Sequence, residues 1–150
     1  MVRLEDTRRY RVPRDSAFNY ITDPHNWPEY WPGLVAVTDP QARWQHPGDT
    51  MRLQMKLAGR PTELHMTLDR IQVPSLVTYH TVQHGLPDAQ HERHFDPADD
   101  GFVYRLVITY RPRPGVTGLL DRTFVKWAIR RVMRQTLDNL DRRLAPRRDT

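Results

Sequence analysis

Cysteine is absent from the 150-residue chain, which excludes disulfide frameworks and every site that depends on a thiolate. Long hydrophobic runs are absent too, so we expect no membrane-spanning helix. The first ten residues, MVRLEDTRRY, lack the apolar segment of a secretory signal peptide. These absences together predict a cytoplasmic protein.

The motifs of common catalytic and nucleotide-binding sites are also missing. The serines are Ser16, near the start of an expected helix, and Ser75, in an expected turn, and neither lies in a G-x-S-x-G elbow. There is no P-loop and no Rossmann fingerprint. The sequence therefore implies no cofactor and no nucleophile of these types.

The net charge of +5 and the pI of about 10 would suit a polyanionic partner. The basic residues are mostly arginine, however, and they are spread along the whole chain. We therefore expect a solvated basic surface and no nucleic-acid partner. The length and the 38% hydrophobic content predict one domain over residues 1–150, with the last few residues frayed.

The N-terminal third begins with an expected strand at 3–12, followed by two short helices. The segment 14–22 reads as a helix that ends at Asp23, because the residue before a proline avoids the helical region. Pro24 then suits the first position of a second helical turn or two over 24–31. A further strand is expected near 34–46, bent or interrupted at Pro40.

The segments 50–57 and 62–71 alternate between apolar and polar residues and predict a β-hairpin. With a four-residue turn at 58–61, every Leu and Met of the hairpin shares one face. This register places Lys56 opposite Glu63, a favourable cross-strand pair. Its other predicted pairs are Leu57 with Thr62, Met55 with Leu64, Leu53 with Met66 and Met51 with Leu68.

Three more strands are expected within 76–84, 89–95 and 101–112, and a helical period then extends from about 116 to 144. The predicted fold class is α+β. A curved antiparallel sheet of six to seven strands wraps around a long C-terminal helix, with two short helices after the first strand. The apolar stripe of the helix comprises Val125, Ile129, Val132, Met133, Thr136, Leu137, Leu140 and Leu144.

This order of elements resembles the START-like, helix-grip (SRPBCC) superfamily, in particular its polyketide cyclase/dehydrase and lipid-transport branch. Two segments carry the resemblance: VPRDSAFNYITDPHNWPEYWP at 12–32 and GLLDRTFVKWAIRRVMRQTLDNLDRRL at 118–144. The resemblance covers nearly the whole chain and implies a cavity between the sheet and the last helix. It leaves the activity open, because the superfamily includes lipid carriers, hormone and quinone binders and aromatase/cyclases.

The apolar faces supply expected walls for that cavity, and methionine is frequent among them. We expect the aromatic residues of the 21–32 segment, Trp27, Tyr30 or Trp31, to cap the cavity mouth and pack toward the last helix. The predicted wall residues are Met51, Leu53, Met55, Leu64, Met66, Leu68, Tyr104, Leu106, Ile108, Ile129 and Met133.

Four histidines, His80, His84, His91 and His94, fall on one predicted hairpin. A single metal ion cannot collect them, because His80 and His84 are about 13 Å apart along a strand and His91 and His94 point to opposite faces. We therefore expect no metal site here and interpret these side chains as exposed strand histidines.

Two sets of polar residues compete for the inner face of that hairpin, depending on its register. One set is Tyr79, Glu92 and His94, and the other is His80, His91 and Arg93. Either set can hydrogen-bond a ligand carbonyl or polarise it toward enolisation, as aldol-type cyclisation requires. The resemblance implies inward Arg, Tyr and similar groups in aromatase/cyclases, but no such set matches here residue by residue. From the two strand faces, the catalytic candidates are Tyr79, Glu92, Arg93 and His94. An outward position on the wet face is the alternative.

Leu120, Phe124 and Trp127 lie away from the main stripe of the last helix, beside Arg130, Arg131 and Arg134. This patch can pack under a neighbouring segment such as 27–31, form a partner or dimer surface, or contact an anionic membrane. Monomer and homodimer both stay open.

The favoured function is binding of an apolar small molecule, such as a lipid, a quinone or a polyketide-like compound, without catalysis. The alternatives are an enzyme of the polyketide cyclase, aromatase or dehydratase type and a non-catalytic protein that associates with membranes.

Overall fold

A computed structural model of the chain describes residues 1–38, 43–57 and 59–144. The helices and strands follow the predicted order, and the fold class is confirmed as α+β helix-grip. Their bounds are β1 (Val2–Tyr10), α1 (Arg14–Thr22), the 3-10 turn η1 (Pro24–Asn26), α2 (Trp27–Tyr30), β2 (Leu34–Val37), β3 (Thr50–Leu57), β4 (Arg60–Gln72), β5 (Leu76–Gln83), β6 (Ala89–Ala98), β7 (Gly101–Tyr110), α3 (Val116–Leu120), the π-helical segment η2 (Asp121–Val125) and α4 (Lys126–Arg143).

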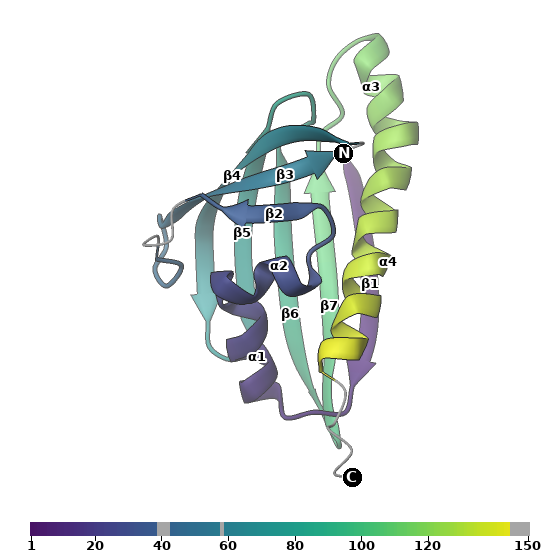
Figure 1. Cartoon of the computed structure of the whole chain (residues 1–150). Helices are drawn as coiled ribbons and strands as arrows, with labels where there is room; N and C mark the ends of the chain where they lie inside the picture. Colours follow the sequence, from purple (N-terminus) through teal and green to yellow (C-terminus); the bar gives the residue numbers. More distant parts are fainter. Residues whose placement is uncertain (39–42, 58, 145–150) are drawn as a thin grey trace.

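The seven strands form one antiparallel sheet in the order β1-β7-β6-β5-β4-β3-β2. Figure 1 shows that the sheet curves around a space that α1, α2 and the last helix close from one side. The apolar side chains of the strands face this space, and the core lies there. Such a one-sided core is what an antiparallel sheet with one wet face requires.

The two short helices are held together at the end of α1. The Asp23 side chain accepts a hydrogen bond from the His25 backbone N–H at 3.0 Å and so starts η1. The free carbonyl of Ile21 accepts two further bonds, from Trp27 Nε1 at 2.9 Å and from the Tyr30 hydroxyl at 2.6 Å. Trp27 and Tyr30 thus supply hydrogen-bond donors to a backbone carbonyl at the C-terminal end of α1, and these bonds hold α2 beside α1.

The β3–β4 hairpin has a tighter turn than predicted, and the predicted register was wrong by two residues. Leu57 pairs with Arg60, so only two residues lie between the strands, and Gly59 has a φ of +77°. Positive φ suits glycine and a tight hairpin turn. The apolar residues keep their common face because a shift by two leaves the alternation unchanged. Lys56 lies opposite Pro61, so the predicted pair with Glu63 does not form.

The expected strand near 34–46 is much shorter in the structure. β2 ends at Val37, and Pro40 lies outside the described residues. Trp44 belongs to no strand, yet it is buried. The β-branched and aromatic residues of this segment led to the prediction of a longer strand. The structure instead places Trp44 in a loop, from which its ring packs into the core.

The last helix runs from Val116 to Arg143 with a π-helical segment near its start. The predicted stripe is confirmed at its centre, where Met133, Leu137 and Leu140 are buried. The carboxylate of Asp121 is fully buried and accepts three hydrogen bonds from Arg113, one from the backbone N–H and two from the guanidinium, at 2.7–3.0 Å. This ion pair ties the helix to the loop after β7.

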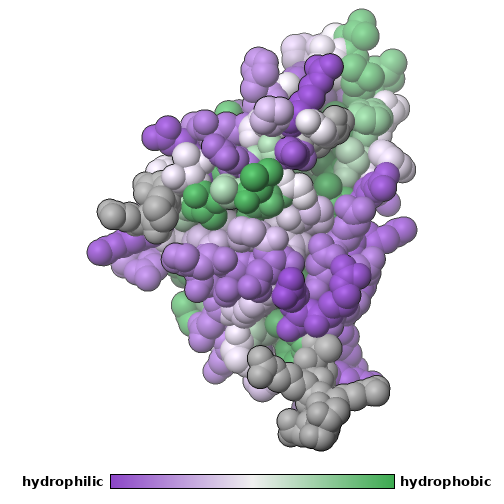
Figure 2. Space-filling model, viewed as in Figure 1, coloured by the Kyte–Doolittle hydropathy of each residue, from purple (hydrophilic) through white to green (hydrophobic). Residues whose placement is uncertain are grey.

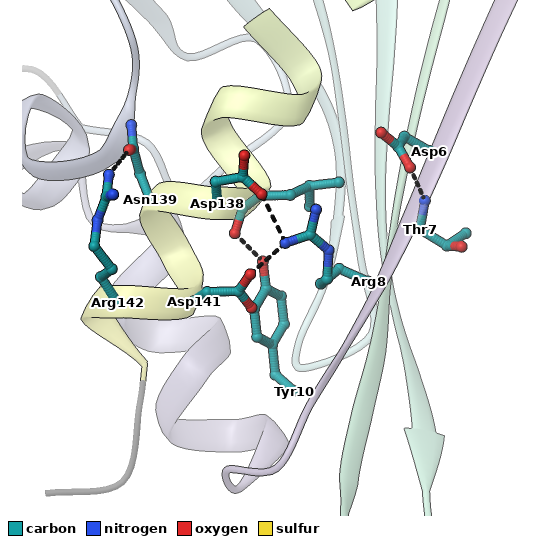
Figure 3. A network of polar contacts seen from close by, with 9 residues as sticks. Asp6, Thr7, Arg8, Tyr10, Asp138, Asn139, Asp141 and Arg142 are labelled. Atoms are coloured by element: carbon teal, nitrogen blue, oxygen red, sulfur yellow. Dashed lines mark hydrogen bonds and ion pairs between the residues drawn. The ribbon is translucent and has the colours of Figure 1, made fainter. Parts of the chain in front are cut away.

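Further contacts fasten the other end of the helix to β1 (Figure 3). The Tyr10 hydroxyl donates to the Leu137 carbonyl at 2.8 Å, and Arg8 bonds Asp138 at 2.9 Å and also Asp141. These ion pairs are partly exposed and stabilise the contact only modestly. Within the described part of the chain, no helix is long and apolar enough to cross a membrane.

Candidate functional site

A buried guanidinium lies at the centre of the fold. Arg93, on β6, is only 9% exposed, and its side chain bonds three tyrosine hydroxyls from three different elements. Tyr79 of β5 accepts from Nε at 3.1 Å and from Nη2 at 2.7 Å. Tyr104 of β7 and Tyr30 of α2 accept from Nη1 at 3.3 Å and 3.4 Å. We call these four residues the Arg93 cluster.

The strand register explains why these groups meet. Tyr79 pairs with His91, and Arg93 follows two residues later on β6 and therefore shares its face. Tyr104 lies opposite Phe95, again on this face. The buried positions of β5, β6 and β7 thus all point toward the last helix and the short helices.

Neither predicted set for the inner face is correct as a set, because Glu92 and His94 of the first set and His80 of the second lie on the outer face. Tyr79, His91 and Arg93 face inward. His80 and His94 lie on the opposite face, where they contact the carboxylates of Asp69 at 2.8 Å and Glu92 at 3.2 Å. The sequence left the pairing of β5 with β6 undetermined, since polar residues occupy both faces of these strands.

The Arg93 cluster carries a net positive charge. Among the residues that the structure describes, no carboxylate lies within 4.0 Å of Arg93. Burial opposes the charged guanidinium, but the three tyrosines raise the pKa of Arg93 well above its usual value. Burial also raises the pKa of Tyr104 to about 12 and raises the pKa values of Tyr30 and Tyr79. The hydroxyls therefore stay neutral beside a permanent cation.

Aromatic rings surround the guanidinium. The centroids of the Trp31 and Tyr79 rings lie 5.4 Å and 5.3 Å from the Arg93 Cζ atom, within the range of cation–π attraction. Trp44 packs edge-on against both Trp27 and Tyr79, with centroids 5.7 Å and 5.8 Å away. The sequence pattern did not single out Trp44 for the site, and the only signal was an isolated aromatic residue between two strands.

Two small cavities border the cluster, and Tyr79 and Arg93 line both of them. The larger has a volume of about 70 Å³ and the smaller about 10 Å³, whereas ligand pockets typically measure roughly 300–1,000 Å³. The larger is lined by Trp31, Tyr79, His91, Glu92, Arg93, Leu106, Val107, Ile108, Val132, Met133 and Thr136, and the smaller by Ile21, Thr22, Trp27, Trp44, Met66, Val77, Tyr79 and Arg93.

The structure divides the predicted wall and mouth residues into three groups. Leu106, Ile108, Met133 and Trp31 line the larger cavity, while Met66 and Trp27 line the smaller. Tyr30 and Tyr104 bond Arg93. The remainder pack in or against the core and line neither cavity: Met51, Leu53, Met55, Leu64, Leu68 and Ile129.

The cavity thus lies against β6, β7 and α4 and away from the β3–β4 hairpin. Near that hairpin, the rings of Trp27 and Trp44 occupy the space beside Met66. Sequence alternation predicted which residues face the interior. It does not show which part of the interior is filled by side chains and which part remains a cavity.

His91 is a neutral polar group on the cavity wall. Its ring stacks on Tyr79 with 4.6 Å between centroids, and its Nε2 lies 2.9 Å from the Thr81 hydroxyl. Burial and the nearby charge of Arg93 lower its pKa to about 3. Within the described residues, no three His, Asp or Glu side chains are placed to hold a metal ion.

This low pKa predicts a pH-dependent contribution to stability. His91 ordinarily titrates near 6.5 but does so near 3 in the folded chain, so between these values the unfolded state binds more protons. The free energy of unfolding should therefore fall on acidification from pH 6.5, by at most about 1.4 kcal/mol per pH unit from this group.

Urea denaturation between pH 7 and pH 4 checks the His91 prediction. His91→Gln should show a shallower pH dependence than the wild type, and the same change at the exposed His84 is the matched control. Equal slopes for wild type and His91→Gln would show that His91 does not titrate as described.

A curved sheet that grips a long helix, with a polar cluster beside a small internal cavity, defines a helix-grip protein. The chain belongs to the polyketide cyclase/dehydrase and lipid transport family, whose sequence pattern matches residues 1–145. The predicted superfamily is thus confirmed. No curated protein sequence matches the chain significantly.

Solved structures share this fold at low sequence identity. CV1439 from Chromobacterium violaceum aligns over 97% of this chain and 99% of its own, with a TM-score of 0.78 and 16% identity. Ms6760 from Mycobacterium smegmatis aligns over 98% and 93%, with a TM-score of 0.76 and 16% identity. The Zhui aromatase/cyclase from Streptomyces sp. R1128 aligns over 92% and 90%, with a TM-score of 0.72 and 14% identity. At these identities, the likeness establishes the fold alone.

Proposed function

We propose that the protein binds an apolar small molecule in the larger cavity, with an oxygen of the ligand accepting a hydrogen bond from Arg93. The observation that carries the proposal is the buried cation without a carboxylate partner in the described structure. A buried charge is costly unless it is paired. A ligand carboxylate or phenolate would supply the missing negative charge, and a ligand carbonyl oxygen would supply a further hydrogen-bond acceptor.

The hydrogen-bond inventory of the guanidinium supports this proposal. Arginine has five N–H donors, and four bonds run from Arg93 to the tyrosines, one each from Nε and Nη2 and two from Nη1. Among the described residues, one N–H of Nη2 has no acceptor and is left for a ligand. Hydrogen bonds that involve a charged group contribute roughly 1.5–3 kcal/mol, about twice as much as neutral ones.

The small cavity implies that side chains move when a ligand binds. Trp31 is the natural lid, because it is partly exposed, covers the guanidinium and lines the cavity. Met133 lines the opposite, helical side, and its unbranched side chain can change rotamer at low cost. The ligand would thus enter between the 27–31 segment and α4.

A matched pair of probes tests the proposal. The compounds 2-naphthoate and 2-methylnaphthalene have similar shapes, but only the first presents oxygen atoms. We expect 2-naphthoate to bind the wild-type protein roughly 10–100-fold more tightly, from the strength of a charged hydrogen bond. Titration with tryptophan-fluorescence detection measures both affinities. Equal affinities, or failure of both probes to bind, would refute the proposal.

Native mass spectrometry of protein purified from its own host complements these titrations. A co-purifying acid, phenol or ketone of low polarity is the expected result. A co-purifying hydrocarbon chain without such an oxygen would contradict the role given to Arg93.

A second candidate is an enzyme of the polyketide cyclase or dehydratase type. Arg93 favours it, because a buried cation can stabilise an enolate oxygen as it forms. The pKa shifts of His91 and of the three tyrosines of the Arg93 cluster oppose a role of these groups in acid–base catalysis. Efficient acid–base catalysis needs a pKa near the working pH, whereas those of His91 and the cluster tyrosines move away from neutrality. Turnover of a bound ketide by the wild type that is lost in His91→Gln would favour the enzyme.

A further inference from the structure

The start of the last helix exposes a row of large apolar side chains. Leu119, Leu120, Phe124 and Trp127 are 65%, 53%, 64% and 56% exposed, and Val116 precedes them at 83%. We call these five residues the tip patch. The hypothesis that this surface packs under the 27–31 segment was wrong, since Trp27 instead contacts Trp31 and Trp44 in the core.

Val116, Leu120, Phe124 and Trp127 follow one another at spacings of four, four and three, and Leu119 lies three residues after Val116, so the five residues gather on one side of the helix. Figure 1 shows that α3 extends past the end of the sheet, and Figure 2 shows apolar surface gathered at this extremity. The tip patch therefore projects from the molecule. Monomeric proteins rarely gather exposed apolar side chains in this way unless the surface contacts something.

Positive charge surrounds the patch. Between residues 111 and 135, the sequence has seven Arg or Lys and a single acid, Asp121. That acid is fully buried and paired with Arg113, so it does not neutralise the surface. Arg131 lies with its guanidinium 5.5 Å from the centroid of the Trp127 ring. Within the described structure, no ion pair engages the basic side chains at 122, 126, 130, 131 and 134.

We propose that the tip patch docks on an anionic lipid bilayer, with Phe124 and Trp127 inserted at the level of the headgroups and the surrounding cations over the lipid phosphates. Tryptophan favours this interfacial depth because its ring is apolar and its N–H is polar. Basic residues beside an apolar helix face attract anionic lipids and hold the helix in the plane of the interface. This inference does not depend on the ligand proposed for the cavity.

The geometry and the charge favour a bilayer over a protein partner. Two copies that meet through the tip patch in a two-fold dimer would bring like charges together, which opposes association. A protein partner would need pockets complementary to the protruding side chains. A bilayer surface accepts such side chains without a preformed shape.

Sedimentation with vesicles tests the docking. We expect binding to vesicles of phosphatidylcholine with 30% phosphatidylglycerol and at least tenfold weaker binding to phosphatidylcholine alone. Phe124→Ser with Trp127→Ser should weaken binding to the anionic vesicles by more than tenfold. Lys126→Gln and Arg130→Gln should each weaken it by about fivefold, since each basic residue near the surface contributes a similar increment.

Two controls separate docking from misfolding and from non-specific attraction. Val35→Ser and Val73→Ser remove exposed apolar residues elsewhere and should leave binding unchanged. Circular dichroism should show that all the variants are folded.

Three outcomes would overturn the proposal. One is equal binding to the two vesicle types, and another is binding that survives Phe124→Ser with Trp127→Ser. The third is a dimer in size-exclusion chromatography that these two changes dissociate, which would assign the tip patch to a second copy.

Discussion

Replacing Arg93 and two of its three tyrosine partners with apolar residues should leave the protein as stable as the wild type, or more stable, while its preference for oxygen-bearing ligands disappears. The variant combines Tyr79→Phe, Arg93→Met and Tyr104→Phe, and we call it the cluster variant. Replacing a buried charge and its hydrogen-bonding partners together with apolar groups of similar volume is often neutral or stabilising, by up to about 4 kcal/mol. The fourth member, Tyr30, keeps its bond to the Ile21 carbonyl.

A partial change of the cluster should have the opposite effect. Tyr79→Phe with Tyr104→Phe leaves the guanidinium buried with Tyr30 as its one tyrosine partner. We expect this pair of changes to lower the free energy of unfolding by roughly 3–5 kcal/mol, as for other buried charges that lose their partners. Urea denaturation measures both variants. If the cluster variant proves several kcal/mol less stable than the wild type, the arginine has a structural role and needs no ligand.

Neutralising the buried acid of the last helix should cause the other large effect. Asp121→Asn keeps the shape of the side chain but removes the charge that accepts three hydrogen bonds from Arg113. We expect a loss of about 3 kcal/mol, the lower end for buried ion pairs, because the Arg113 side chain is 32% exposed. The Arg113 guanidinium also holds the pKa of this carboxyl below its usual value.

A matched substitution on the same helix separates burial from charge. Asp138→Asn removes an acid that is half exposed, and Arg8 keeps its second partner, Asp141. The expected loss is below about 1 kcal/mol. Equal losses for Asp121→Asn and Asp138→Asn in urea denaturation would contradict the structural role given to the buried pair.

The features that could be predicted from the sequence are those that a periodic pattern determines. Alternation on β7 placed Tyr104 and Leu106 on the inner face, and the 3.6-residue period of the last helix placed Met133 and Leu137 toward the core. Both follow from which side of an element is apolar.

The features that could not be predicted depend on spatial relations between elements. The β3–β4 register was wrong because a shift by two residues preserves every face. The inward position of Arg93 together with Tyr79 depended on the pairing of β5 with β6, and polar residues on both faces gave no preference. Trp44 contacts Trp27 and Tyr79, which are distant from it in the sequence, and no periodic pattern in the sequence predicts such contacts.

A thermodynamic cycle of two proteins and two probes tests the central claim most directly. Isothermal titration of 2-naphthoate and 2-methylnaphthalene into the wild type and the cluster variant isolates the interaction between the ligand oxygen and the Arg93 cluster. The account predicts a coupling of roughly 1.5–3 kcal/mol, all of it from weaker binding of 2-naphthoate to the variant. A coupling of zero, with both probes unaffected by loss of the cluster, would contradict it.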